Sequence, residues 1–258
     1  MELVRVDTKR EVLIAEDEDA ATGFATVRFI AIAQKAILEH KFFSCALLGG
    51  TTGIKFFQKL ASLDAAKHLD WSKVRLFWSD ERAVPPDSPD SNYGNVLSYL
   101  QQEPISQATL FRMPADEEDL ASACHKYEVL IKENCHEGRF DLVLLGAGKD
   151  GHTASLFPFS AALHVQNRLV APCYVPEKSV RRMSLTFPCI NEARKIIVIM
   201  LGKEKADILQ KAFFGSKEPD KYPIQSIGQG SGPALFITDT AAADRLGKEK
   251  FHEQESAL

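Results

Sequence analysis

Hydrophobic residues along the chain follow two alternating patterns. Apolar residues at helical spacing predict helices at Ala20–Leu38, Thr52–Leu63, Asn92–Gln101, Leu120–Lys132 and Lys203–Phe213. Between them, short apolar runs predict buried strands at Phe43–Leu48, Val74–Trp78, Phe140–Leu145, Met183–Phe187, Ile196–Leu201 and Ala234–Thr238. The segment Gly215–Gly232 is rich in Gly, Ser, Pro and Lys, and we expect it to form a long surface loop.

This alternation predicts one α/β domain over residues 1–258, built on a mostly parallel, Rossmann-like β-sheet with helices on both faces. In such sheets, ligands bind beyond the carboxyl ends of the strands. Three polar clusters follow predicted strands directly, at Gly49–Thr52, Ser79–Arg82 and Gly146–Thr153. We therefore expect these clusters to meet at one site.

Charge and cysteine content argue against several classes of protein. A net charge of −4 gives no general attraction to nucleic acid or to anionic membranes, so we expect neither as a partner. Charges are scattered through residues 1–19, unlike a signal peptide, and no apolar run approaches the ~18 residues of a membrane span. The five cysteines form neither a disulfide framework nor a CxxC pair. We expect a cytoplasmic protein, as a monomer or weak homodimer.

The first cluster, Gly49-Gly50-Thr51-Thr52, lies where a strand turns into a helix. Backbone N–H groups and two hydroxyls there would face an anion at the positive end of a helix, which is typical of a phosphate site. The same sequence is also typical of a tight strand-to-helix turn that is capped by threonine and binds no ligand. The spacing matches neither a P-loop nor a dinucleotide-binding fingerprint, which argues against nucleotide binding.

The other two clusters carry groups able to move protons. Asp150 and His152 lie in a glycine-rich turn, where a histidine can take a proton from water and return it to a leaving oxygen, although a buried histidine with a structural hydrogen bond is the alternative. Asp80 and Arg82 flank Glu81 in a segment that could equally be an exposed charged loop. No set of residues has the spacing of metal ligands, and we expect neither a metal nor another cofactor.

The motifs at these positions resemble the 6-phosphogluconolactonase family, which belongs to the superfamily of glucosamine-6-phosphate isomerase/deaminase. The family patterns appear here as GGTTG, DERAVP followed by SN, LGAGKDGHTASLFP, RMSLT and GKEKA. The resemblance covers nearly the whole chain, and the LGAGKDGHTASLFP segment is the most specific part.

The resemblance implies hydrolysis of 6-phospho-D-glucono-1,5-lactone to 6-phospho-D-gluconate in the oxidative pentose phosphate pathway. It implies a base at His152 and phosphate contacts at Gly50, Thr51, Arg182 and Lys205. Without the resemblance, Arg182 and Lys205 would be weak candidates for phosphate binding, because the chain has 31 Lys and Arg residues and most such residues are solvated at the surface. Asp150, or else Asp80, would orient the imidazole, and Arg82 or nearby N–H groups would stabilise the oxyanion.

Sequence features distinguish a lactonase from an isomerase and from a non-catalytic binding module. The isomerase branch typically has a tyrosine where Arg82 stands and a glutamate several residues after the histidine, where this chain has Pro158 and Phe159. A binding module without catalysis is the rival of another class, and the intact pair Asp150 and His152 argues against it. The chain departs from the family at Gly53, where proline is usual, and at Phe159, where a small residue is common.

Overall fold

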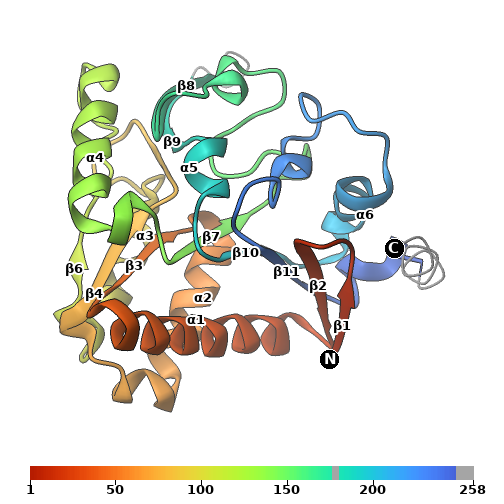
Figure 1. The fold of residues 1–258 in the computed structure, drawn as a ribbon, viewed down its shortest axis with the longest axis horizontal. Helices are drawn as coiled ribbons and strands as arrows, with labels where there is room; N and C mark the ends of the chain where they lie inside the picture. Colours follow the sequence, from red (N-terminus) through yellow and green to blue (C-terminus); the bar gives the residue numbers. More distant parts are fainter. Residues whose placement is uncertain (176–179, 248–258) are drawn as a thin grey trace.

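The computed structural model describes residues 1–175 and 180–247. Its main sheet has eight strands in the order β1-β2-β11-β10-β7-β3-β4-β6, all parallel except for the β1–β2 hairpin (Figure 1). The strands are β1 (Glu2–Arg5), β2 (Arg10–Ala15), β3 (Phe43–Leu47), β4 (Val74–Trp78), β6 (Thr109–Leu110), β7 (Leu142–Gly146), β10 (Ile196–Met200) and β11 (Ala234–Asp239). The predicted mostly parallel sheet is therefore confirmed, and the β1–β2 hairpin extends it.

A second, antiparallel sheet of three strands was not predicted. It contains β5 (Asp80–Arg82), β9 (Val180–Leu185) and β8 (Val170–Val175), in the order β5-β9-β8. The strand predicted at Met183–Phe187 was wrongly bounded, because its apolar residues continue into a helix that begins at Phe187. Backbone pairing, rather than an apolar pattern, makes the charged segment β5 a strand.

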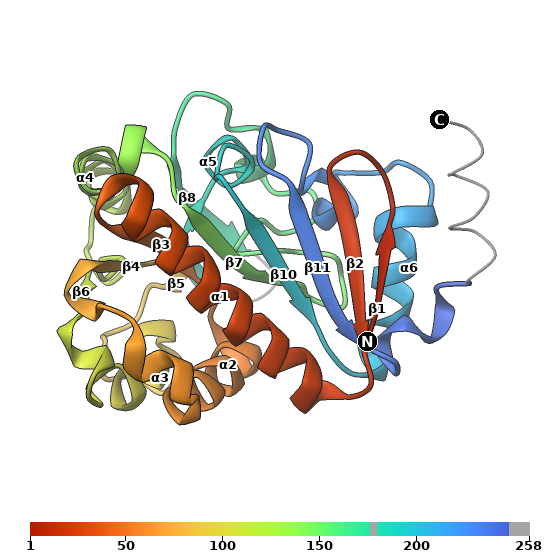
Figure 2. The ribbon, with the colours of Figure 1, turned by 60° about the horizontal axis from the view of Figure 1, so that its bottom comes forward.

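The helices are α1 (Glu18–His40), α2 (Gly50–Ser62), α3 (Asn92–Leu100), α4 (Leu120–Asn134), α5 (Phe187–Asn191) and α6 (Ala206–Phe214). Short 3-10 turns lie at Asp64–His68, Trp71–Lys73, Ile105–Gln107, His136–Gly138, Ala161–His164, Lys203–Lys205, Pro223–Ser226 and Ala242–Arg245. Figures 1 and 2 show α1 crossing one face of the main sheet, with α4, α5 and α6 on the other side. The five predicted helices are confirmed, with small shifts at their ends. The predicted loop Gly215–Gly232 contains one 3-10 turn and is otherwise irregular.

Helix α1 corrects one expectation about apolar runs. It is the one helix in the described part of the chain that is long and apolar enough, by length and composition, to cross a membrane. No continuous apolar run in the sequence predicts such a helix, because isolated polar residues interrupt the apolar residues of α1. Within the stretch that meets this test, 44% of the residues are buried in the protein, and α1 packs on β11, β3 and β2. Core helices of globular proteins share these properties.

The order in which strands are added to the main sheet reverses between β3 and β7, which are parallel neighbours at its centre. The strands β4 and β6 continue the sheet beyond β3, whereas β10, β11 and β2 continue it beyond β7. The segments that leave β3 and β7 therefore diverge and open a crevice at their carboxyl ends, where α/β sheets bind ligands.

Candidate active site

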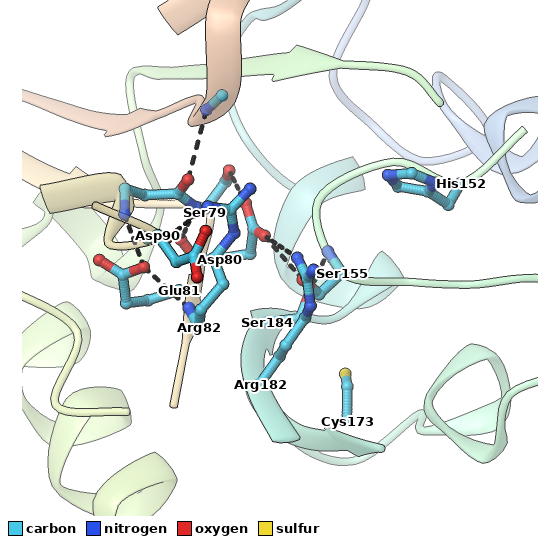
Figure 3. Close-up of polar contacts among 12 residues, drawn as sticks. Ser79, Asp80, Glu81, Arg82, Asp90, His152, Ser155, Cys173, Arg182 and Ser184 are labelled. Atoms are coloured by element: carbon cyan, nitrogen blue, oxygen red, sulfur yellow. Dashed lines mark hydrogen bonds and ion pairs between the residues drawn. The ribbon is translucent and has the colours of Figure 1, made fainter. Parts of the chain in front are cut away.

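A cavity of about 370 Å³ occupies this crevice. The carboxyl-terminal segments of β3, β4 and β7 all line it, so the three polar clusters meet as expected. Among the predicted site residues, those that line the cavity are Gly49, Gly50, Thr51, Thr52, Asp80, Arg82, His152, Arg182 and Lys205. Figure 3 shows the part of the site formed by the second sheet and the loop that carries His152.

His152 forms a close pair with Asp150. Its Nδ1 atom lies 2.6 Å from Oδ1 of Asp150, and its backbone N–H donates to the same oxygen at 3.2 Å. Burial alone would raise the pKa of Asp150, but the hydrogen bond and charge of His152, together with backbone N–H groups, lower that pKa to about 2. Asp150 is thus a carboxylate that accepts the Nδ1 proton, while Nε2 has no hydrogen-bond partner among the described residues.

Close packing fixes the orientation of this imidazole. The ring stacks on Phe157 with centroids 4.3 Å apart. A Cβ atom at Gly148 would lie 2.2 Å from the ring, so the backbone there approaches His152 more closely than any side chain would allow. The glycine-rich sequence before the histidine therefore allows close packing against the imidazole as well as a tight turn of the backbone.

The proposed phosphate segment forms the first turn of α2. Helix α2 begins at Gly50, with Gly49 as its N-cap, so the N–H groups of this turn lie at the positive helix end. Asn92, which the sequence analysis did not single out, lies beside it and accepts a hydrogen bond from Gly50 N at 3.3 Å. The Asn92 side chain also donates to the carbonyl of Asp80 at 2.9 Å, so it ties the first cluster to the second.

Glu81 fixes the second cluster from inside the protein. Its carboxylate accepts hydrogen bonds from the backbone N–H groups of Asn92 and Tyr93, both at 2.8 Å, and from Ser91 Oγ at 3.0 Å. Burial raises the pKa of Glu81, although these N–H groups favour its charged form. Glu81 thereby fastens β5 to the start of α3, and its neighbour Arg82 reaches the cavity with a guanidinium that donates to the carbonyl of Asp90.

Asp80 and Arg182 lie on neighbouring strands and share a third partner. Ser155 donates its hydroxyl to Oδ2 of Asp80 at 2.7 Å, and Nη1 of Arg182 lies 3.4 Å from the same hydroxyl. In Figure 3 these side chains form one cluster, and no contact joins Asp80 to His152. Of the two carboxylates considered as orienting groups, Asp150 is the one in contact with the imidazole.

Lys205 approaches the cavity from the turn before α6. Its side chain is half-buried, and this burial lowers its pKa, as does the charge of Lys149, while Glu204 and Asp150 raise it. Three further residues that line the cavity, Glu18, Lys55 and Asn92, were not predicted as site residues. Glu18 and Lys55 carry no motif, because they are ordinary charged residues of helices α1 and α2. Asn92 belongs to the SN motif that follows DERAVP, and this motif was the signal that could have identified it.

Comparisons with known proteins identify the family of the chain. Residues 16–236 match the family model described as glucosamine-6-phosphate isomerases/6-phosphogluconolactonase. A 6-phosphogluconolactonase from Chlamydia pneumoniae is 34% identical, with 94% of this chain and 93% of that protein covered. One from Synechocystis sp. is 36% identical, with 82% and 88% covered.

Solved structures give the same picture. The chain is similar to a structure described as devB protein, with a TM-score of 0.81, 28% identity and coverage of 92% of this chain and 100% of the other. It is also similar to 6-phosphogluconolactonase from Thermotoga maritima, with a TM-score of 0.74, 26% identity and 90% and 100% covered. The match over residues 16–236, together with these relatives, shows that the chain belongs to the glucosamine-6-phosphate isomerase/6-phosphogluconolactonase family.

Proposed function

We propose that this protein hydrolyses 6-phospho-D-glucono-1,5-lactone to 6-phospho-D-gluconate, with a water molecule activated by His152. One observation carries the proposal: His152, which is paired with Asp150, lines the same cavity as Arg182, Lys205 and the first turn of α2. A base and an anion site at fixed separation are what a phosphorylated lactone requires. The relatives named as 6-phosphogluconolactonases support this substrate.

The first step is the attack of water on the lactone. Asp150 holds the proton on Nδ1 of His152, so the lone pair on Nε2 is available to accept a proton from water. The resulting hydroxide adds to the C1 carbonyl carbon, whose oxygen becomes the oxyanion of a tetrahedral intermediate. Arg82 is the cation from the second cluster proposed to stabilise that charge.

The second step opens the ring. The tetrahedral intermediate collapses, the bond between C1 and the ring oxygen breaks, and the protonated His152 gives its proton to that oxygen. The product is an open-chain acid, and the histidine returns to its starting state. The anion site fixes the distance between the carbonyl and His152, which lowers the entropic cost of the attack.

Covalent catalysis by cysteine has little support at this site. Cys173 lies opposite Arg182 in the second sheet, and burial raises the pKa of its thiol to about 12. All five cysteines are buried. A thiol with so high a pKa is a poor nucleophile near neutral pH.

The fold alone does not distinguish a lactonase from an isomerase. A monomeric glucosamine-6-phosphate deaminase has a similar fold, with a TM-score of 0.74 at 18% identity. The motif residues favour the lactonase, because the isomerase branch typically has a tyrosine at the position of Arg82 and a glutamate several residues after the histidine, where this chain has Pro158 and Phe159. A cytoplasmic location and a monomeric or weakly dimeric state remain predictions from the sequence.

The direct experiment is an assay of the purified protein with 6-phospho-D-glucono-1,5-lactone, corrected for spontaneous opening of the ring. We expect saturable hydrolysis and no release of ammonia from glucosamine 6-phosphate. Binding of 6-phosphogluconate without any acceleration of lactone opening would instead support a binding module. Ammonia release would support the isomerase/deaminase chemistry.

A further inference from the structure

Ser155 connects the loop that carries His152 to the second sheet, which carries Asp80 and Arg182. It is fully buried and follows His152 by three residues on the same loop. Its hydroxyl donates to Asp80 Oδ2, and its backbone N–H donates to Ser184 Oγ at 3.1 Å. Because β5 and β9 pair Asp80 with Ser184, Ser155 is bonded to both strands of that pair (Figure 3).

Asp80 and Arg182 are close but do not form a direct hydrogen-bonded ion pair. The nearest atoms, Nη1 of Arg182 and Oδ2 of Asp80, are 3.9 Å apart, whereas paired guanidinium and carboxylate groups lie about 2.7–2.9 Å apart. Each oxygen of the carboxylate has another donor, Ser155 on Oδ2 at 2.7 Å and Ser79 on Oδ1 at 3.3 Å. The shorter contact, from Ser155, involves the oxygen that faces Arg182.

Arg182 is correspondingly short of partners. Its Nε atom is buried and has no hydrogen-bond partner in the described part of the chain, and Nη1 makes only the long contact of 3.4 Å to Ser155. Its guanidinium carbon also lies 5.3 Å from the centre of the Phe157 ring. Buried guanidinium groups normally satisfy most of their donors, so the charge of Arg182 is held available for an acceptor that enters the cavity.

We propose that Ser155 is a positioning residue that holds the Asp80 carboxylate away from Arg182 and so keeps this arginine available to the substrate phosphate. Without the Ser155 hydroxyl, Oδ2 of Asp80 loses its closest donor and Arg182 becomes the nearest replacement. A direct Asp80–Arg182 pair would then compete with the phosphate for the same N–H groups. This inference rests on the proposed function, because it takes Arg182 to be a phosphate contact.

The test is the steady-state kinetics of Ser155→Ala on 6-phospho-D-glucono-1,5-lactone. We expect KM to rise roughly tenfold, the lower range for losing a hydrogen bond to a charged group, with a smaller fall in kcat because the phosphate contact also positions the carbonyl. The same variant should bind 6-phosphogluconate more weakly by a similar factor in calorimetry. A fall in kcat at unchanged KM would overturn the proposal, because it would place Ser155 with His152.

A double-mutant cycle distinguishes this role from a merely structural one. If Ser155 acts through the Asp80 carboxylate, Ser155→Ala should raise KM far less in an Asp80→Asn background, because the neutral amide no longer competes as an anion for Arg182. Equal effects in the two backgrounds would contradict the proposal. Should Ser155→Ala fail to fold, Ser155→Cys keeps nearly the same volume with a weak donor, and it too should raise KM.

The chain offers a matched control in Ser44. This serine is also fully buried and also donates its hydroxyl to a carboxylate, Oδ2 of Asp141, at 2.9 Å, near the amino ends of β3 and β7. Ser44→Ala should lower the thermal midpoint but leave KM unchanged, and an equal rise in KM would count against a specific role for Ser155. If the wild-type protein does not hydrolyse the lactone, the proposed function fails; if it does and Ser155→Ala behaves like wild type, only this inference fails.

Discussion

At the scale of single residues, two carboxylates of the same site have different environments and therefore different uses. Asp150 is partly exposed and contacts His152, whose hydrogen bond and charge help bring its pKa to about 2 despite partial burial. Asp80 is 7% exposed and is bonded to two serine hydroxyls. The first carboxylate can orient an imidazole at neutral pH, whereas the second lies beside Arg182 and has no contact with His152.

Arg182 and Lys205 belong to the same scale, and their proposed role can be measured. Arg182→Ala and Lys205→Ala should each raise the Kd for 6-phosphogluconate roughly 10- to 150-fold, because each removes a charge-assisted hydrogen bond to the phosphate. Gluconate, which lacks the phosphate, should be affected much less. Calorimetry with both ligands checks this, and equal losses for the two would show that neither residue reads the phosphate.

At the scale of elements, the turn from β3 into α2 differs from what the family pattern led us to expect. The predicted helix Thr52–Leu63 has Gly53 in its first turn, where the proline that is usual in the family would preset the backbone φ angle. In the structure, Gly53 is the fourth residue of α2, and its N–H donates to Gly49 O at 3.3 Å. A Cβ atom there would lie 2.6 Å from Leu48 O, so the turn closes against the end of β3 more tightly than any side chain permits.

Two glycine substitutions test this account of the turn. Gly53→Ala should reduce the free energy of unfolding by about 1–3 kcal/mol, because a methyl group would press on the backbone of Leu48. Gly23→Ala in α1 is the matched control, since its Cβ atom would meet only the flexible end of Lys59 at 3.4 Å. That substitution should stabilise the protein by up to ~1 kcal/mol through helix propensity. Urea denaturation measures both; a neutral Gly53→Ala would contradict the tight turn.

At the scale of the whole molecule, the sequence predicts the main sheet well and the second sheet poorly. Strands β3, β4, β7, β10 and β11 are buried on both faces, so their apolar runs stand out. The segment Asp80–Arg82 carries no such pattern, and its partner strand β9 lies about a hundred residues later. Pairings of this kind depend on tertiary structure, which local patterns do not encode.

The functional site, like the fold, was predicted only in part from the sequence. The motifs identified His152, Asp150 and the cluster at Gly49–Thr52, because each lies directly after a strand. They did not reveal the contact of Ser155 with Asp80, since the two residues are 75 positions apart and a serine in a loop is an ordinary residue. The division of the two carboxylates between separate partners therefore required the structure.

Independence from metal ions is a prediction about the whole molecule. Residues 1–175 and 180–247 contain no group of three or more His, Cys, Asp and Glu side chains arranged to hold a metal ion, and the proposed steps use no Lewis acid. Extensive treatment with EDTA should therefore leave kcat and KM unchanged. Loss of activity that a single metal restores would require a different mechanism.

The proposed mechanism depends on His152 as the base that activates water, and the His152→Gln variant removes this base. Glutamine keeps much of the size and polarity of the side chain but cannot accept the proton, so kcat should fall at least about a hundredfold after subtraction of spontaneous ring opening. Folding and the Kd for 6-phosphogluconate should stay close to those of the wild-type protein, because the phosphate contacts are untouched. Near-normal turnover by this variant would show that His152 is not the base that activates water.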